Sequence, residues 1–164
     1  MDFTRLLTEF AAFWKANGDI LVSQQVYHEA APHLVLQAYL QRVVRTPIRS
    51  LRDPSGPPGG GTVLREYGVG RGRLDLLVAW PYRGPEGAQA VQRQAIELKV
   101  RAEGDADPLG SALVQLDGYL DRLGLDTGVL LLFDRRPTAP PIHERTTITA
   151  TTSPAGRPVT LFRG

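Results

Sequence analysis

The sequence predicts an α/β (α+β) fold in which helices flank a mixed central β-sheet. Two helical patterns precede three strand patterns, and a helix, a strand and a β-hairpin follow them. The helix over 108–123 separates two apolar strands, which is typical of a crossover between parallel strands. With 164 residues, the chain is predicted to form one domain, with an N-terminal helix over 1–20, a core over 29–133 and a hairpin over 144–164.

The composition excludes several classes of protein. Hydrophobic residues make up 42% of the chain and the net charge is only +2, which excludes extensive disorder. No apolar run approaches the roughly 20 residues that span a bilayer, so we expect no membrane contact. No signal-peptide pattern opens the chain, and we therefore expect it in the cytoplasm. The absence of cysteine excludes disulfides and thiolate sites, and His28, His33 and His143 lack metal-ligand spacing and are expected to be structural.

Amphipathic helices are predicted at the start of the chain. Apolar residues recur at helical spacing over 3–16, and Asn17-Gly18 is a typical stop signal, so the first helix is predicted to end there. A second helix is predicted from about Glu29 to Val44, with Pro32 in its first turn, where proline is tolerated. The segment 46–61 is rich in proline and glycine and is predicted to be a loop.

An antiparallel meander of three strands is predicted next. Its strands are expected over 62–69, 73–80 and 91–100, with a turn rich in proline and glycine over 81–87. The second strand is an almost continuous apolar run, as expected of a buried central strand. The remaining elements are a helix over 108–123 that ends at Gly124, a buried strand over 128–133, a proline-rich loop over 134–141 and a hairpin of strands over 145–152 and 158–162.

Three charged side chains interrupt the apolar strands. Asp75 lies between two leucines, and Glu97 and Lys99 alternate with apolar residues on the next strand. Residues two apart on a strand point to the same face, so Glu97 and Lys99 project together and Asp75 can join them. A carboxylate in an apolar strand is costly unless it is paired or bound to a metal. Two carboxylates also form a hard-oxygen site for Mg²⁺ or Mn²⁺, with an amine beside it.

An ordinary structural role for these charges is the alternative. Glu97 and Lys99 could form a solvated edge face, and Asp75 could be a surface residue. The apolar flanks argue against this, because they indicate central strands. The choice of cation also argues against it: of 19 lysine and arginine residues only Lys15 and Lys99 are lysines, so 17 are arginines. Lysine has a pKa that shifts readily, and arginine cannot replace it in handling protons.

The order of these residues resembles the PD-(D/E)XK nuclease superfamily. The resemblance rests on Gly72-Arg73-Leu74-Asp75, on Ile96-Glu97-Leu98-Lys99 and on a following helix with Gln115 and Tyr119. It covers roughly Glu29 to Phe133 and implies a restriction-endonuclease-like core with elements in the order αβββαβ. Leu74 stands where the family name has proline, a position at which many members differ.

The resemblance implies a Mg²⁺-dependent nuclease that hydrolyses phosphodiester bonds of DNA. Asp75, Glu97 and the backbone carbonyl of Leu98 would hold the metal ion, which polarises the phosphate and acidifies a bound water. Glu29, at the start of the second helix, would match a glutamate that several branches use. Glu66, on the first strand, is its rival as a further ligand.

Other residues would complete such a site. Lys99 would orient or deprotonate the attacking water and offset charge in the transition state. Gln115 and Tyr119 lie one helical turn apart and would position the water or a phosphate. As an alternative, Tyr119 could be a core residue and Gln115 could cap a strand. The candidate phosphate contacts are Arg71, Arg73 and Arg101, which could instead lie on solvated strand faces.

Two alternatives to an active nuclease remain open. A catalytically inactive, nuclease-like module could bind nucleic acid, or the chain could be a protein-interaction domain. The apolar stripe of the first helix (Phe3, Phe10, Phe13 and Trp14) bears on the second alternative. We expect this stripe to pack on the sheet, and docking of a protein partner or of a second copy is the other possibility.

Overall fold

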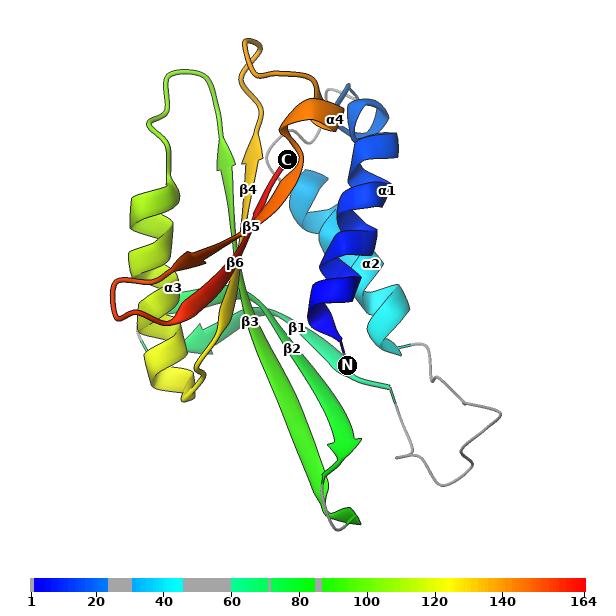
Figure 1. Ribbon diagram of the computed structural model, residues 1–164, viewed down its shortest axis with the longest axis vertical. Coiled ribbons are helices and arrows are strands. Elements are labelled where there is room, and N and C mark those ends of the chain that lie inside the picture. Colours follow the sequence, from blue (N-terminus) through cyan, green and yellow to red (C-terminus); the bar gives the residue numbers. More distant parts are fainter. Residues whose placement is uncertain (1, 24–30, 46–59, 71, 85–86) are drawn as a thin grey trace.

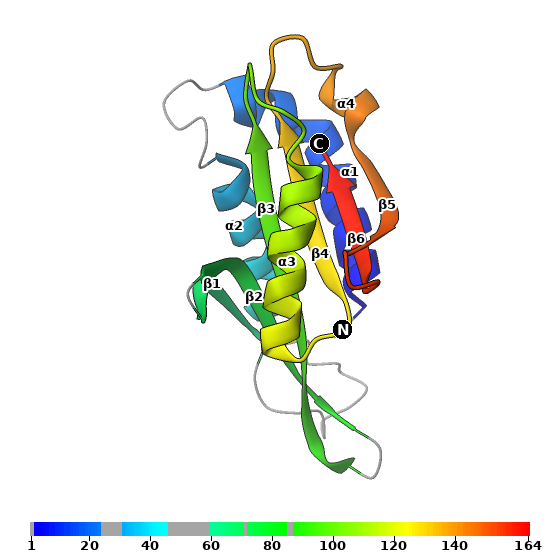
Figure 2. The ribbon, with the colours of Figure 1, turned by 90° about the vertical axis from the view of Figure 1, so that its left-hand side faces the viewer.

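A six-stranded mixed sheet separates two layers of helices (Figure 1). The computed structural model describes residues 2–23, 31–45, 60–70, 72–84 and 87–164. Helices α1 (Phe3–Ser23) and α2 (Ala31–Arg45) cover one face of the sheet, and α3 (Leu109–Leu123) covers the other (Figure 2). A short helix, α4 (Ile142–Arg145), lies beside α1. The predicted α/β class, with a mixed sheet between helices, is confirmed.

The sheet has the order β1-β2-β3-β4-β6-β5. Its strands are β1 (Thr62–Val69), β2 (Gly72–Arg83), β3 (Gln89–Arg101), β4 (Gly128–Asp134), β5 (Thr147–Thr152) and β6 (Pro158–Arg163). Strands β1, β2 and β3 pair antiparallel, β3, β4 and β6 run parallel, and β5 pairs antiparallel with β6. The predicted meander, parallel crossover and terminal hairpin are therefore present.

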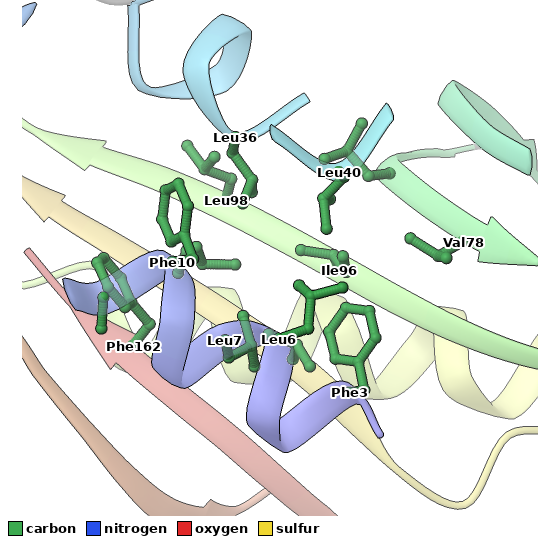
Figure 3. Packing of buried hydrophobic residues seen from close by; sticks show 14 of the residues in the cluster. Phe3, Leu6, Leu7, Phe10, Leu36, Leu40, Val78, Ile96, Leu98 and Phe162 are labelled. Atoms are coloured by element: carbon green, nitrogen blue, oxygen red, sulfur yellow. The ribbon is translucent and has the colours of Figure 1, made fainter. Parts of the chain in front are cut away.

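Alternation along the strands divides the apolar side chains between two cores. On one face, Ile96 and Leu98 of β3 pack with side chains of α1 and α2 (Figure 3). On the other face, Ala95 of β3 packs with side chains of α3, among them Leu116 and Leu120. Every second residue of β3 therefore points toward α3, and this alternation sets the direction of the charged residues discussed below.

The first helix is longer than predicted. It continues through Asn17-Gly18 to Ser23, so the predicted end at Gly18 is wrong. The physical reason is close packing rather than chain termination. Gly18 is buried, and a Cβ atom there would lie 2.9 Å from Cδ1 of Ile142 on α4 and 3.3 Å from Trp14. Glycine lets α4 approach α1, and the helix tolerates it.

Strand β2 also extends further than predicted. Pro81 was expected to open a turn, but β2 continues to Arg83 and Pro81 is paired with Val91. The pairing of β2 with β1 ends where Thr62 pairs with Ala79. Beyond Ala79, β2 continues to pair with β3, on its other side. Proline is compatible with an edge position of this kind, because no ladder hydrogen bond is lost on the free side.

The apolar stripe of α1 is used inside the protein. Phe3, Phe10 and Trp14 are buried against the sheet, while Phe13 at the border of the stripe stacks on Tyr39 of α2. Most of the stripe is therefore packed on the sheet, as expected, while Phe13 remains exposed at its border. None of the helices in the described ranges is both long and apolar enough to span a membrane.

Candidate functional site

Strand β2 changes its face at Asp75. Leu74 packs in the core on the α3 side, whereas Leu76 packs in the core on the opposite side. Because residues two apart on a regular strand share a face, the backbone must turn between these two leucines. Opposite this bend, Glu66 of β1 has a φ of 48°, a value that residues other than glycine rarely adopt. Asp75 therefore lies at a bend in both strands.

The bend separates β2 from β3 and brings Asp75 into contact with the backbone of Leu98 on β3. The ladder between the two strands ends where Leu76 pairs with Ile96. Beyond that point, Oδ2 of Asp75 accepts a hydrogen bond of 2.8 Å from the backbone amide of Leu98. The carboxylate of Asp75 thus accepts the hydrogen bond of an amide that has no partner in the ladder between β2 and β3. It is anchored at the residue between Glu97 and Lys99.

Glu97 and Lys99 project together from β3. Both alternate with Ile96 and Leu98, so they point to the α3 side of the sheet. Lys99 donates a hydrogen bond of 2.7 Å from Nζ to Oε1 of Glu97. The side chain of Glu97 is 1% exposed and that of Lys99 is 30% exposed. The pair therefore joins a buried carboxylate to a lysine whose side chain is partly exposed.

Glu97 is held in an environment that opposes its charge. The pKa of its carboxyl group is raised to about 7: burial raises it most, the nearby charge of Asp75 also raises it, and the hydrogen bond from Lys99 opposes both effects. The second carboxylate oxygen, Oε2, is buried and has no hydrogen-bond partner among the described residues. A cation bound to this oxygen would offset both the energetic cost of burying the charge of Glu97 and its repulsion from Asp75.

These features fit a divalent metal ion, although the described part of the chain supplies few ligands. Asp75, Glu97 and the carbonyl of Leu98 could hold the ion, and the unpartnered Oε2 is the hard oxygen donor that Mg²⁺ and Mn²⁺ prefer. Within the described ranges, no group of three or more His, Asp or Glu side chains could do so. Glu29 lies outside the described residues. The carboxylate of Glu66 pairs with arginine side chains, including Arg73 at 3.3 Å.

His33 is a neighbour of the site that sequence reasoning missed. Burial lowers its pKa, the charge of Asp75 raises it and the charge of Lys99 lowers it, so the imidazole lies within electrostatic reach of both groups. The spacing of residues in the sequence does indicate that His33 faces inward. His33 precedes the buried residues Leu36 and Leu40 at spacings of three and seven, which assigns it to the inward stripe of α2.

Gln115 and Tyr119 support β2 rather than the carboxylates. The hydroxyl of Tyr119 donates a hydrogen bond of 2.8 Å to the carbonyl of Arg73 and accepts one of 3.0 Å from Nε2 of Gln115. A Cβ atom at Gly72 would lie 2.8 Å from this hydroxyl, so glycine makes room for it. Tyr119 is thus a buried core residue whose hydroxyl fixes the strand two residues before Asp75.

We expect Tyr119→Phe to lower the free energy of unfolding by about 1 kcal/mol, the usual effect of one lost hydrogen bond. The ring keeps the core filled, but the carbonyl of Arg73 loses its donor. Urea unfolding measures the change, and Tyr82→Phe, at an exposed tyrosine of β2, is the matched control. Equal stabilities of the two variants would show that the hydroxyl does not hold the strand.

The predicted phosphate contacts have different surroundings. Arg71 lies outside the described residues. The side chain of Arg73 is 75% exposed and pairs with Glu66. Arg101 lies two residues beyond Lys99 on the same face of β3, and its Nε donates to the backbone carbonyl of Asp105. Arg101 is therefore the arginine that follows the charged pair along its strand.

Comparison with known proteins adds no assignment. No protein-family model matches the chain, and no curated protein and no solved structure is significantly similar to it. The activity of the chain must therefore be inferred from the chemistry of the site itself.

Proposed function

We propose that this chain is a Mg²⁺-dependent nuclease that hydrolyses phosphodiester bonds of DNA on a restriction-endonuclease-like core. The observation that carries the proposal is the convergence of Asp75, Glu97 and Lys99 at the point where β2 and β3 separate. The order of α2, β1, β2, β3, α3 and β4 also agrees with the expected order αβββαβ.

The two carboxylates have the chemistry of metal ligands. Asp75 and Glu97, with the carbonyl of Leu98, would hold one Mg²⁺ or Mn²⁺ ion, which supplies positive charge to the phosphate and makes a bound water more acidic. Oδ2 of Asp75 is fixed by the amide of Leu98, so this ligand would need little reorganisation. The buried position of Glu97 excludes water from one side and strengthens its attraction for a cation.

Lys99 has the chemistry of a group that handles protons or charge. Its ammonium group is held by Glu97, and the side chain is 30% exposed, so a substrate could approach it. From there it would orient the attacking water or stabilise negative charge that develops on the phosphate. Tyr119 and Gln115 would contribute indirectly, because they hold in place the strand that bears Asp75.

Cleavage of supercoiled plasmid and of single-stranded DNA tests the proposal. We expect cleavage with Mg²⁺ or Mn²⁺, none in the presence of a chelator, and none with Asp75→Asn. Crystals soaked in Mn²⁺ should show anomalous density between Asp75 and Glu97. DNA binding without cleavage under all of these conditions would indicate an inactive nucleic-acid-binding module instead.

DNA affinity should depend steeply on salt, because each phosphate that an arginine neutralises releases counterions. Replacing Arg73 or Arg101 with glutamine should reduce the slope of log affinity against log salt by about one and weaken all sequences alike. Anisotropy titrations without divalent metal measure the slope. Arg5→Gln, at an exposed residue of α1, is the control and should leave the slope unchanged. A flat dependence for the unmodified chain would contradict binding through phosphates.

A further inference from the structure

A pocket lined by arginines lies at the carboxyl ends of the parallel strands. Its volume is about 50 Å³, and its lining includes Arg101, Arg145 and Arg163 together with Leu132 and Gly164. The carboxyl ends of β3 and β4, helix α4 and the C-terminus lie at the same end of the molecule (Figure 1). The space exceeds the roughly 15 Å³ that one water molecule needs, so it can admit a small polar group.

The strand register links this pocket to Lys99. Leu132 of β4 pairs with Lys99 of β3 on one side and with Arg163 of β6 on the other, and it faces α3. The Cα atoms of Lys99 and Arg163 are thus two strand spacings apart, about 10 Å, with both side chains on the α3 side. Arg101 lies about 7 Å beyond Lys99 along β3. The part of the pocket formed by Arg101 and Arg163 therefore lies beside Lys99, whereas Arg145 comes from α4, which packs against α1.

Nearby carboxylates compensate the guanidinium groups of the pocket in part: Arg163 has an ion-pair partner, and Asp107 also interacts electrostatically with Arg101. Asp134 also lines the pocket, but it is engaged by Arg136 in an ion pair of 2.7 Å. Arg163 pairs with Asp107 at 3.0 Å. No carboxylate side chain within the described ranges lies within 4 Å of the guanidinium nitrogens of Arg101 or Arg145.

Arg145 is the most constrained of the three arginines. Its Nη1 donates a hydrogen bond to the carbonyl of Pro140, whereas its Nε is buried and has no partner among the described residues. Burial lowers its pKa, and the charges of Asp134 and Asp19 oppose this effect. An anion in the pocket would stabilise this partly buried guanidinium group through its charge.

We propose that this pocket binds a phosphate group of the nucleic-acid strand, next to the phosphate that is cleaved. The proposal rests on the proposed nuclease function and adds a second contact point for the same strand. Arginine suits this role, since its planar fork can donate two parallel hydrogen bonds to phosphate oxygens. The group could be a terminal phosphate or an internal phosphodiester, and the two make the same contacts.

Binding of short oligonucleotides in the presence of a chelator tests the proposal without requiring cleavage. The probes are one single-stranded sequence with a 5′-phosphate, with a 3′-phosphate or with hydroxyl groups at both ends. The variants are Arg145→Gln and Arg163→Gln, and Arg5→Gln on α1 is the control for the loss of one positive charge. Thermal unfolding of each variant verifies the fold, and two pocket variants guard against misfolding of one.

Both pocket variants should weaken binding about tenfold, the usual effect of one charged hydrogen bond, and Arg5→Gln should change it little. If the unmodified chain prefers one phosphorylated end and the variants lose that preference, the pocket holds a terminal phosphate. Equal weakening with all three probes assigns it to an internal phosphate.

Pocket variants that bind as tightly as Arg5→Gln would overturn the pocket while leaving the nuclease proposal intact. Binding that depends on the pocket, without cleavage by the unmodified chain in Mg²⁺, would overturn the nuclease proposal and leave the pocket as a phosphate site of a nucleic-acid-binding module. An unmodified chain that binds none of the probes would overturn the pocket proposal, and plasmid cleavage would then decide the nuclease proposal separately.

Discussion

Lys99→Ala should abolish DNA cleavage while leaving the fold and DNA affinity nearly intact. Lys99 is the member of the charged pair whose side chain is partly exposed, and in the proposed mechanism its ammonium group acts on the phosphate or the water. Its loss leaves Glu97 buried without its partner. Because the pKa of Glu97 is already about 7, this carboxyl group can take up a proton and avoid an uncompensated charge. Single-turnover cleavage, thermal unfolding and anisotropy titration without divalent metal measure the cleavage, the fold and the DNA affinity.

Lys99→Arg separates the possible roles of the lysine. Guanidinium keeps the charge but is larger and does not release a proton, so we expect cleavage to fall at least about 100-fold, the usual contribution of general acid–base catalysis. The chain offers a matched control in Lys15→Arg, at the only other lysine, on the exposed face of α1. Nearly full activity of Lys99→Arg would show that the residue acts only as a positive charge.

Without divalent metal, the stability of the protein should fall as the pH rises from about 4.5 to about 7, because the pKa of Glu97 is raised from 4.5 to about 7 in the folded state. Below this range, Glu97 is protonated in both the folded and unfolded states, so its ionisation does not affect stability. Above it, Glu97 is charged in both states, and the folded state carries the full penalty of roughly 3 kcal/mol. Glu97→Gln keeps a neutral side chain and should lack this loss.

Unfolding at pH 5 and pH 8 measures this difference, with and without Mg²⁺. Because metal binding requires the deprotonated carboxylate, Mg²⁺ should stabilise the unmodified chain more at pH 8 than at pH 5. It should have little effect on Glu97→Gln at either pH. Other groups also titrate in this range, so the informative quantity is the difference between the two proteins. The same pH dependence in both would show that Glu97 is not the group responsible.

The alternation of β3 could be predicted from the sequence, and with it the shared direction of Glu97 and Lys99. Ile96 and Leu98 are apolar neighbours on a strand of period two, so no other assignment buries both of them on one face. The pairing of β2 with β3 followed from the short turn between them. What could not be predicted is the contact between Asp75 and the amide of Leu98, because it depends on a bend at Glu66 that no sequence signal marks.

Features that depend on docking between distant elements could not be predicted from the sequence either. Gly18 looks like a helix stop when only its neighbours along the chain are considered. Its actual role requires Ile142, which lies more than a hundred positions later. In the same way, the helical stripe assigns His33 to an inward position, but only the docking of α2 on the sheet brings it near Asp75.

The bend at Asp75 has a consequence for how the protein folds. Only 23 positions separate Asp75 from Leu98, so a single hairpin brings these residues together through local contacts, which generally form early. The face that bears Glu97 is covered only when α3 docks, which requires the longer crossover from β3 to β4. We therefore expect Glu97 to leave water late in folding. We expect the final kinetic phase of folding, rather than the collapse of the hairpin, to become slower as the pH rises through 7.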